Sequence, residues 1–161
     1  MRVGRFGILV CAMMMAMSAM ASAAPPKVAL SLSGAVITMV RDKTVASPLA
    51  GKPVKRGETI RYTILAKNIG SQPALALVPK GKVPTNTEFL RVLNVPKGTR
   101  VEYTLDGTAW SPKPMITVMG KDGKPHRAAA PPALFHGVRW IVEGPLPAHQ
   151  MLSFPYEVRV K

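Results

Sequence analysis

The chain has 161 residues, with 22 Lys and Arg against eight Asp and Glu, which gives a formal net charge of +14 at neutral pH. This length suits one domain with a single core, and such a charge draws a protein towards anionic surfaces and polymers. The only cysteine is Cys11, so an internal disulfide is excluded and stability must come from packing.

The first 23 residues have the pattern of a secretory signal peptide. Arg2 and Arg5 form a basic start, residues 8–17 are apolar, and residues 21–23 are small. The apolar stretch is shorter than a membrane-spanning helix requires. We therefore expect cleavage after Ala23, with a retained membrane anchor as the alternative, and no transmembrane span in the mature chain 24–161. Without the two leader arginines the formal charge falls from +14 to about +12.

Short apolar segments separated by turn residues follow the leader. Residues 27–32 alternate apolar and other side chains, and residues 36–40 form a second apolar segment after Gly34, so we predict a strand in each. Residues 43–55 contain Pro and Gly and are predicted to be a loop.

Residues 57–70 predict the central strand of the fold. Side chains alternate here with a period of two, which predicts one buried and one wet face. The buried set is Ile60, Tyr62, Ile64 and Ala66, and the wet set is Thr59, Arg61, Thr63 and Lys67. Gly57 before the strand, and Asn68 and Gly70 after it, are predicted to adopt positive φ where the chain turns.

Further strands are predicted over residues 74–78, 89–95, 101–105, 115–119, 138–142 and 152–160. Asp106 and Gly107 predict a tight hairpin turn. Residues 120–132 have the composition of a mobile surface loop. Pro155 cannot donate a ladder hydrogen bond, which predicts that its strand lies at a sheet edge or contains a bulge.

Seven to nine evenly spaced strands without a helical period predict an all-β fold, an antiparallel β-sandwich with Greek-key connections. An all-β barrel is the alternative. Pro155 favours the sandwich, because a strand at a sheet edge does not belong to a closed barrel.

Residues 57–70 also resemble a known family. The pattern Gly-Glu-Thr-Ile-x-Tyr-Thr-Ile, followed by Asn-x-Gly, is similar to the start of the bacterial surface-repeat domain DUF11, an immunoglobulin-like sandwich. The similarity continues through residues 74–77, 83–89, 138–140 and 152–160, so that it covers residues 54–161. The resemblance implies one immunoglobulin-like copy in a surface protein and names no ligand. Gly81 and His149 depart from it, since the family usually has Asp and Gly there, and no capping or cation-binding role is carried over to Gly81.

Metal and cofactor sites are not expected. His126, His136 and His149 are separated by about ten residues or more, which is not a zinc-ligand spacing. Met115 and Met119 with His126 would suit a cuprous ion, but they lack the cluster of Met or His that such sites use.

Catalysis is not expected either. The sequence has no Gly-x-Ser-x-Gly elbow, and its mature part has no thiol. Asp106 and Glu143 could converge as paired carboxylates, but most of the acids stand beside basic residues, so surface ion pairs are expected. We find no Gly-rich phosphate loop for a nucleotide. Trp140 is predicted to be a core residue, whereas Trp110 is either a core residue or a carbohydrate-stacking one.

Nucleic-acid binding is not expected, because the aromatic residues are spaced like core residues of separate strands and do not form a stacking platform. Three basic clusters in predicted loops are the best candidates for binding an anion. They consist of Lys52, Lys55 and Arg56, then Lys80 and Lys82, and then Lys121, Lys124 and Arg127. A solvated surface without a specific partner is the structural alternative.

Two functions are therefore open for an exported protein of the periplasm, the cell surface or the medium. The first is a structural, adhesive or protein-interaction module of the bacterial cell envelope, binding an envelope protein by strand addition at a sheet edge. The alternative is a small cationic protein that holds an anionic envelope polymer, such as lipopolysaccharide, in the basic loops.

Overall fold

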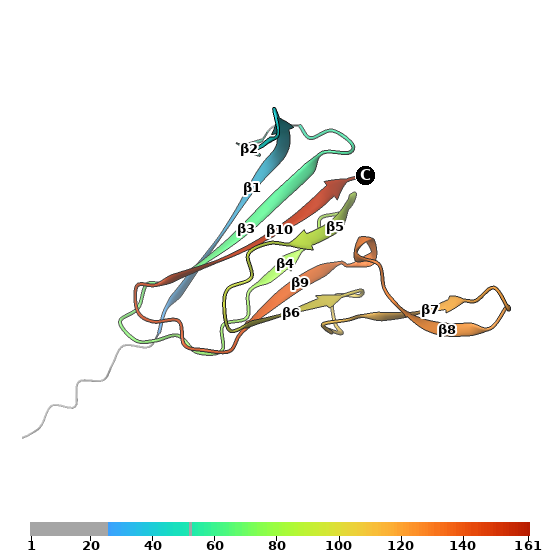
Figure 1. The fold of residues 1–161 in the computed structure, drawn as a ribbon. Helices are drawn as coiled ribbons and strands as arrows, with labels where there is room; N and C mark the ends of the chain where they lie inside the picture. The colour runs from blue at the N-terminus through green and yellow to red at the C-terminus, as the bar shows by residue number, and fades with distance from the viewer. Residues whose placement is uncertain (1–25, 52) are drawn as a thin grey trace, which may run out of the picture.

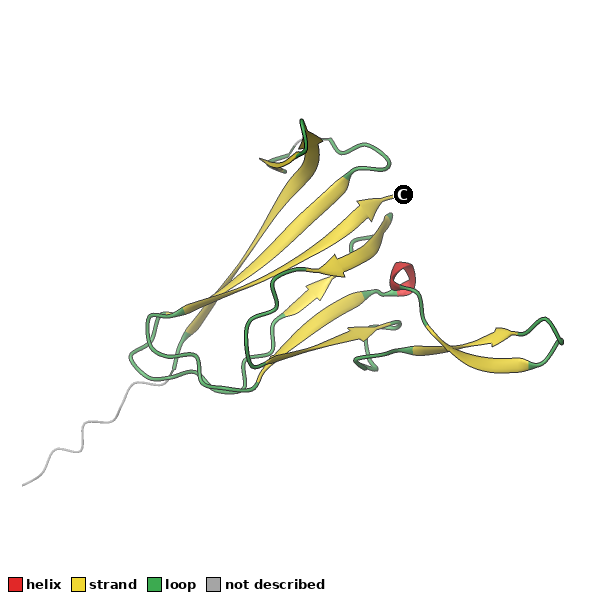
Figure 2. Cartoon of the chain, in the orientation of Figure 1, coloured by secondary structure: helices red, strands yellow, loops and turns green. Residues whose placement is uncertain are grey.

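Ten strands in antiparallel sheets make up the fold in the computed structural model, which describes residues 26–51 and 53–161 (Figures 1 and 2). The strands are β1 (Val28–Val40), β2 (Lys43–Pro48), β3 (Thr59–Asn68), β4 (Lys80–Lys82), β5 (Thr87–Val92), β6 (Thr99–Thr104), β7 (Met115–Met119), β8 (Pro125–Ala129), β9 (Gly137–Val142) and β10 (Met151–Val160), with one 3-10 turn, η1 (Pro132–Leu134). The predicted all-β sandwich is confirmed. The predicted signal peptide, residues 1–23, lies outside the described residues.

Two sheets form the layers of the sandwich. The larger has the strand order β2-β1-β3-β10-β5, and the smaller has the order β4-β9-β6. A separate hairpin, β7-β8, extends from one end (Figure 1). No helix among the described residues is long and apolar enough to cross a membrane.

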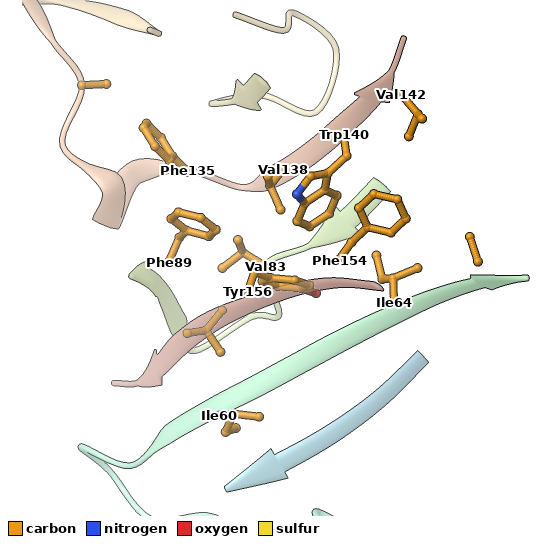
Figure 3. Packing of buried hydrophobic residues seen from close by; sticks show 13 residues of the cluster. Ile60, Ile64, Val83, Phe89, Phe135, Val138, Trp140, Val142, Phe154 and Tyr156 are labelled. Atoms are coloured by element: carbon orange, nitrogen blue, oxygen red, sulfur yellow. The ribbon is translucent and has the colours of Figure 1, made fainter. Parts of the chain in front are cut away.

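The core lies between the two layers and is rich in aromatic rings (Figure 3). Trp140 of β9 packs against Phe154 of β10 with ring centroids 5.5 Å apart, and Phe89 of β5 packs against Tyr103 of β6 at 5.5 Å. Trp140 is fully buried, as the sequence predicts. In the smaller sheet, β9 therefore faces β10 and β6 faces β5 of the larger one.

The N-terminal hairpin differs from the prediction. β1 is one strand of 13 residues that runs through Gly34, and it pairs with β3 over Val28 to Ile37 and with β2 over Ala35 to Val40. The prediction of a loop over residues 43–55 is wrong for residues 43–48, which form β2. Arg41 and Asp42 both take positive φ and form the tight turn between β1 and β2. Arginine is not a typical turn residue, so the sequence does not indicate this turn.

Two later segments also differ from their predictions. Residues 74–78 do not form a strand: Ala74 makes only an isolated bridge to Leu146, and the strand begins at Lys80. Residues 125–129, predicted to be part of a mobile loop, form β8 and pair in full register with β7. Three strands that were not predicted, β2, β4 and β8, bring the number in the described residues to ten, above the predicted seven to nine.

Pro155 lies in β10 between β3 and β5, so the predicted edge position is wrong, and the other predicted alternative, a strand that contains a bulge, is the one that agrees with the structure. Its carbonyl accepts a hydrogen bond from the N–H of Leu93 at 2.9 Å. Because the N and the C=O of one strand residue point to the same side, the missing N–H of Pro155 faces the end of β5 at Val92. The pairing register with β5 shifts two residues later, between Glu157 and Val158.

Candidate binding surface

The larger sheet has more strands than the smaller one, and this leaves part of its inner face open. Leu30 and Leu32 of β1 pair with Ala66 and Ile64 of β3, whose side chains are buried in the core, so all four share the inner face. Ala66 and Ile64 are covered by the smaller sheet, yet Leu30 is 59% exposed and Leu32 is 63% exposed. No strand of the described chain covers these leucines.

A groove of about 540 Å³ runs between this open face and β4. We call it the open groove. Its lining consists of Leu30, Ser31, Leu32, Tyr62, Ile64, Lys80, Gly81, Lys82, Pro84, Thr85 and Tyr156. A second hollow of about 380 Å³ continues from Tyr62 and Pro84 towards Leu49 and Val54. The lining is apolar on the side of the larger sheet, and on the other side it is formed by β4 and the segment that follows it to Thr85.

The wall of the open groove is an edge strand. β4 ends its sheet, with β9 on one side only. The N–H of Trp140 donates to the carbonyl of Pro79, and the N–H of Val83 donates to the carbonyl of His136, both at 3.0 Å. Because backbone groups alternate in direction along a strand, those of Lys80 and Lys82 point away from β9 and towards the open groove.

Gly81 and Tyr156 fix the position of this edge. A Cβ at Gly81 would lie 2.7 Å from the Tyr156 ring, so only glycine permits this approach. The Tyr156 hydroxyl donates to the carbonyl of Lys82 at 2.8 Å. Burial, together with the neighbouring Tyr62, raises the pKa of Tyr156 to about 12, so the hydroxyl keeps its proton at neutral pH. β4 is therefore anchored directly to the core.

A second groove, of about 610 Å³, lies on the other side of β4. We call it the basic groove, because Lys80, Lys82 and Lys161 line it. Trp110 forms part of the wall, with the guanidinium Cζ of Arg139 4.9 Å and the Lys80 Nζ 5.8 Å from its ring centroid. Trp110 is half-buried, so it is neither a core residue nor fully exposed.

Asp106 is the one acid in the lining of the basic groove. Its carboxylate accepts hydrogen bonds from the backbone N–H groups of Thr108 and Ala109 and from the Thr104 hydroxyl. The two backbone bonds hold the pKa of Asp106 well below its usual range. This carboxylate therefore stays ionised in the turn that follows β6.

Arginines and lysines have different roles in the described residues. Each ion pair there uses an arginine, and the pairs are Arg61 and Arg91 with Glu157, Arg100 and Arg139 with Glu102, Arg100 with Glu143, and Arg159 with Glu88. No lysine of the described chain lies within ion-pair distance of a carboxylate. The unpaired positive charge around both grooves is therefore carried by lysine.

The three predicted basic clusters are not brought together. Lys80 and Lys82 lie on a strand, where a loop was predicted, and they line both grooves. Lys121, Lys124 and Arg127 lie on the β7-β8 hairpin, which contributes no residue to either groove. Lys55 and Arg56 precede β3, and Lys52 lies outside the described residues. Lys161, which the sequence analysis missed, joins Lys80 and Lys82 because the last strand ends beside them.

The candidate metal ligands and carboxylates lie apart. His126 pairs with Val118, so it faces the opposite side of the β7-β8 hairpin from Met119. Asp106 and Glu143 lie beyond opposite ends of β6. Residues 26–51 and 53–161 contain no group of three His, Cys, Asp or Glu that could hold a metal ion.

Comparison with known proteins gives no assignment: no family model matches the chain, and neither curated proteins nor solved structures give a significant match. The resemblance to DUF11 therefore stays a prediction from residues 57–70 and the segments that follow them.

Proposed function

We propose that the chain is a non-enzymatic interaction module of the bacterial cell envelope, exported by its N-terminal segment, which binds another protein along the open groove. The observation that carries the proposal is the pair of exposed leucines on an inner sheet face. Beside them stands an edge strand, β4, whose outward Lys80 N–H, Lys80 C=O and Lys82 N–H have no hydrogen-bond partner in the described chain. Inner faces of sandwiches are normally covered, and contiguous exposed apolar surface marks interaction sites.

The energetics favour occupation of the open groove. Full burial of a leucine side chain contributes about 1.5–3 kcal/mol, so Leu30 and Leu32 together offer several kcal/mol to a partner that covers them. Tyr62 and Ile64 continue the apolar floor of the groove. The carboxylates near β4 and β9 are already held by arginines or by a turn, which leaves binding, not acid–base chemistry, as the function that this region supports best.

Replacing Leu32 by glutamate should abolish partner binding that survives high salt, because a charge on the groove floor opposes apolar contact. Leu32 is 63% exposed, so the fold should tolerate the change. The measurement is retention of an envelope protein by the purified mature domain at about 1 M salt, where screening removes surface electrostatics. Leu75→Glu is the matched control, since Leu75 is 72% exposed and lines none of the grooves. Equal retention by both variants would contradict the proposal.

A second candidate function is supported by the basic groove. Lys80, Lys82 and Lys161 have no carboxylate partner among the described residues, and they surround a groove that has Trp110 in its wall. The Lys80 ammonium group over the Trp110 ring, with Lys82 and Lys161 in the same lining, suits an anionic saccharide, such as a lipopolysaccharide core. This second candidate is the cationic polymer-binding protein considered in the sequence analysis. Its proposed site is now the basic groove and no longer the three separate basic clusters.

The charge variants Lys80→Gln, Lys82→Gln and Lys161→Gln, combined, should weaken lipopolysaccharide binding about tenfold or more at physiological salt. The triple variant Lys121→Gln, Lys124→Gln and Arg127→Gln removes the same charge from the β7-β8 hairpin and should leave affinity within about twofold. Titration calorimetry with both variants separates the two effects. Equal loss in both would mean that only net charge matters, which would reject the basic groove as the site.

A further inference from the structure

We propose that the partner enters the open groove as an added β-strand on β4, and that this strand alternates apolar with acidic residues. The inference rests on the proposed function and states the backbone geometry and side-chain pattern of its ligand. The edge of β4 would supply hydrogen bonds from backbone to backbone. The two faces that the added strand would meet would determine which side chains it carries.

The backbone groups are already aligned for this pairing. Pro79 and Val83 direct theirs to β9, so those of Lys80 and Lys82 point outwards with the spacing of a strand. The carbonyl of Lys82 already accepts from the Tyr156 hydroxyl at 2.8 Å, which limits movement of the edge and leaves the N–H and C=O of Lys80 and the N–H of Lys82 for an added strand. A pre-positioned edge reduces the entropy that a peptide loses on binding. A strand added to β4 would become the fourth strand of the smaller sheet. It would lie over the exposed leucines of β1.

The two faces of the added strand meet different surroundings. Gly81 faces the core, so Lys80 and Lys82 project from the outer face of the sheet. Residues of the added strand that point outwards would lie beside these two ammonium groups, and opposite charges on paired strands are favourable. The alternate residues would point inwards onto Leu30 and Leu32. Acidic residues outside and apolar residues inside are therefore the complementary pattern.

The same charges exclude two other occupants. A second copy pairing through β4 would place Lys80 and Lys82 opposite the lysines of its partner, and like charges across strands are destabilising. The N-terminal residues 1–25 contain two arginines and no acid, and residues 8–17 are apolar without alternation. Neither a second copy paired through β4 nor residues 1–25 has the side-chain pattern that the open groove requires. The occupant is therefore an acidic segment of another polypeptide.

The test uses random peptides of about twelve residues displayed on phage and selected on the mature domain. Enriched sequences should alternate apolar with Asp or Glu over five or more positions. A synthetic peptide of the enriched sequence is then N-methylated at one set of alternating residues or at the other. The set that faces β4 should lose binding about tenfold or more, and the other set should bind nearly as the parent. This comparison leaves the protein unchanged.

Protein variants test the same edge. Lys80→Pro removes the outward N–H but no bond to β9, whereas Lys80→Ala removes the charge and keeps the N–H. We expect Lys80→Pro to bind the peptide about tenfold more weakly than Lys80→Ala does. The double reversal Lys80→Glu and Lys82→Glu should shift selection from acidic to basic peptides. If Lys80→Pro fails to fold, the N-methylated peptides still test strand addition, and the charge reversal still tests the preference for acidic peptides.

The outcomes separate this inference from the function on which it rests. Peptides that require Leu32 but tolerate N-methylation at both sets would overturn strand addition and leave protein binding at the open groove standing. Enriched peptides without acidic residues would overturn the charge pattern. A selection that yields no peptide dependent on Leu32 would overturn both the inference and the proposed function.

Discussion

Replacing Asn68 by alanine is expected to lower the free energy of unfolding by about 3 kcal/mol. The Asn68 side chain is fully buried, and its Nδ2 donates to the carbonyls of Gln72 at 2.8 Å and Leu146 at 2.9 Å. Its Oδ1 accepts from the N–H of Gly70 at 3.0 Å. Alanine would leave these backbone groups without their partner, and each such group costs about 1–3 kcal/mol when buried. Urea unfolding of both proteins gives the difference.

Asn68→Asp is the informative companion variant. It keeps the shape and the acceptor for Gly70, but it replaces the Nδ2 group, which donates twice, with one oxygen that faces two carbonyl oxygens. We therefore expect aspartate to cost at least as much as alanine at neutral pH. If aspartate were nearly neutral, the hydrogen bonds of Asn68 would not be what joins the segment after β3 to the segment before β10.

Replacing Glu157 by glutamine is expected to cost about 2–3 kcal/mol at neutral pH. Glu157 is 1% exposed and lies on the outer face of the larger sheet, where Arg61 and Arg91 cover it. The Oε1 atom accepts from Arg61 at 2.7 Å, and Oε2 accepts from Arg91 at 2.8 Å. Glutamine leaves both guanidinium groups without a counter-charge. Glu88→Gln removes a more exposed ion pair with Arg159 and should cost less than about 1 kcal/mol.

The same pair predicts how stability changes with pH. Burial raises the pKa of Glu157, but the hydrogen bonds and charges of Arg61 and Arg91 outweigh it, so the pKa lies below its ordinary value. A carboxyl with a lowered pKa stabilises the fold above its unfolded-state pKa, and this contribution disappears as the pH falls through its folded-state pKa. The stability difference between wild type and Glu157→Gln should therefore shrink below about pH 4.5. A difference that is constant down to strong acid would contradict this origin.

The alternation of apolar residues predicts the central strand because the inward face of β3 is buried except at Tyr62, which is half-buried beside the open groove. Ile60, Ile64 and Ala66 are in the core as expected, and Gly57 takes the predicted positive φ of 87°. Asn68 and Gly70 do not take positive φ: Asn68 acts through its side chain instead. An Asn-x-Gly sequence is compatible with a turn at positive φ and with an asparagine that bonds backbone groups through its side chain. The choice depends on the position of Leu146, which is far along the chain.

The open groove could not be predicted, because alternation states which face of a strand is apolar and not whether another sheet covers it. Leu30 and Leu32 have the same pattern as Ile60 and Ile64, yet only the second pair is buried. The difference arises from the number of strands in the opposite sheet. Lys80 and Lys82 were identified as candidates from their charge, but their place on an edge strand depends on pairing with β9, more than fifty residues later.

Hydrogen exchange at the outward amides of β4 shows most directly whether a partner docks at this edge. Nuclear magnetic resonance would follow the N–H groups of Lys80 and Lys82 in the domain of residues 24–161, free and saturated with a ligand whose binding requires Leu32. Docking at this edge predicts fast exchange of both amides in the free protein and strong protection in the complex, with Val83 protected in each state by its bond to His136. Unchanged exchange at Lys80 and Lys82 in the saturated complex would contradict docking at the β4 edge.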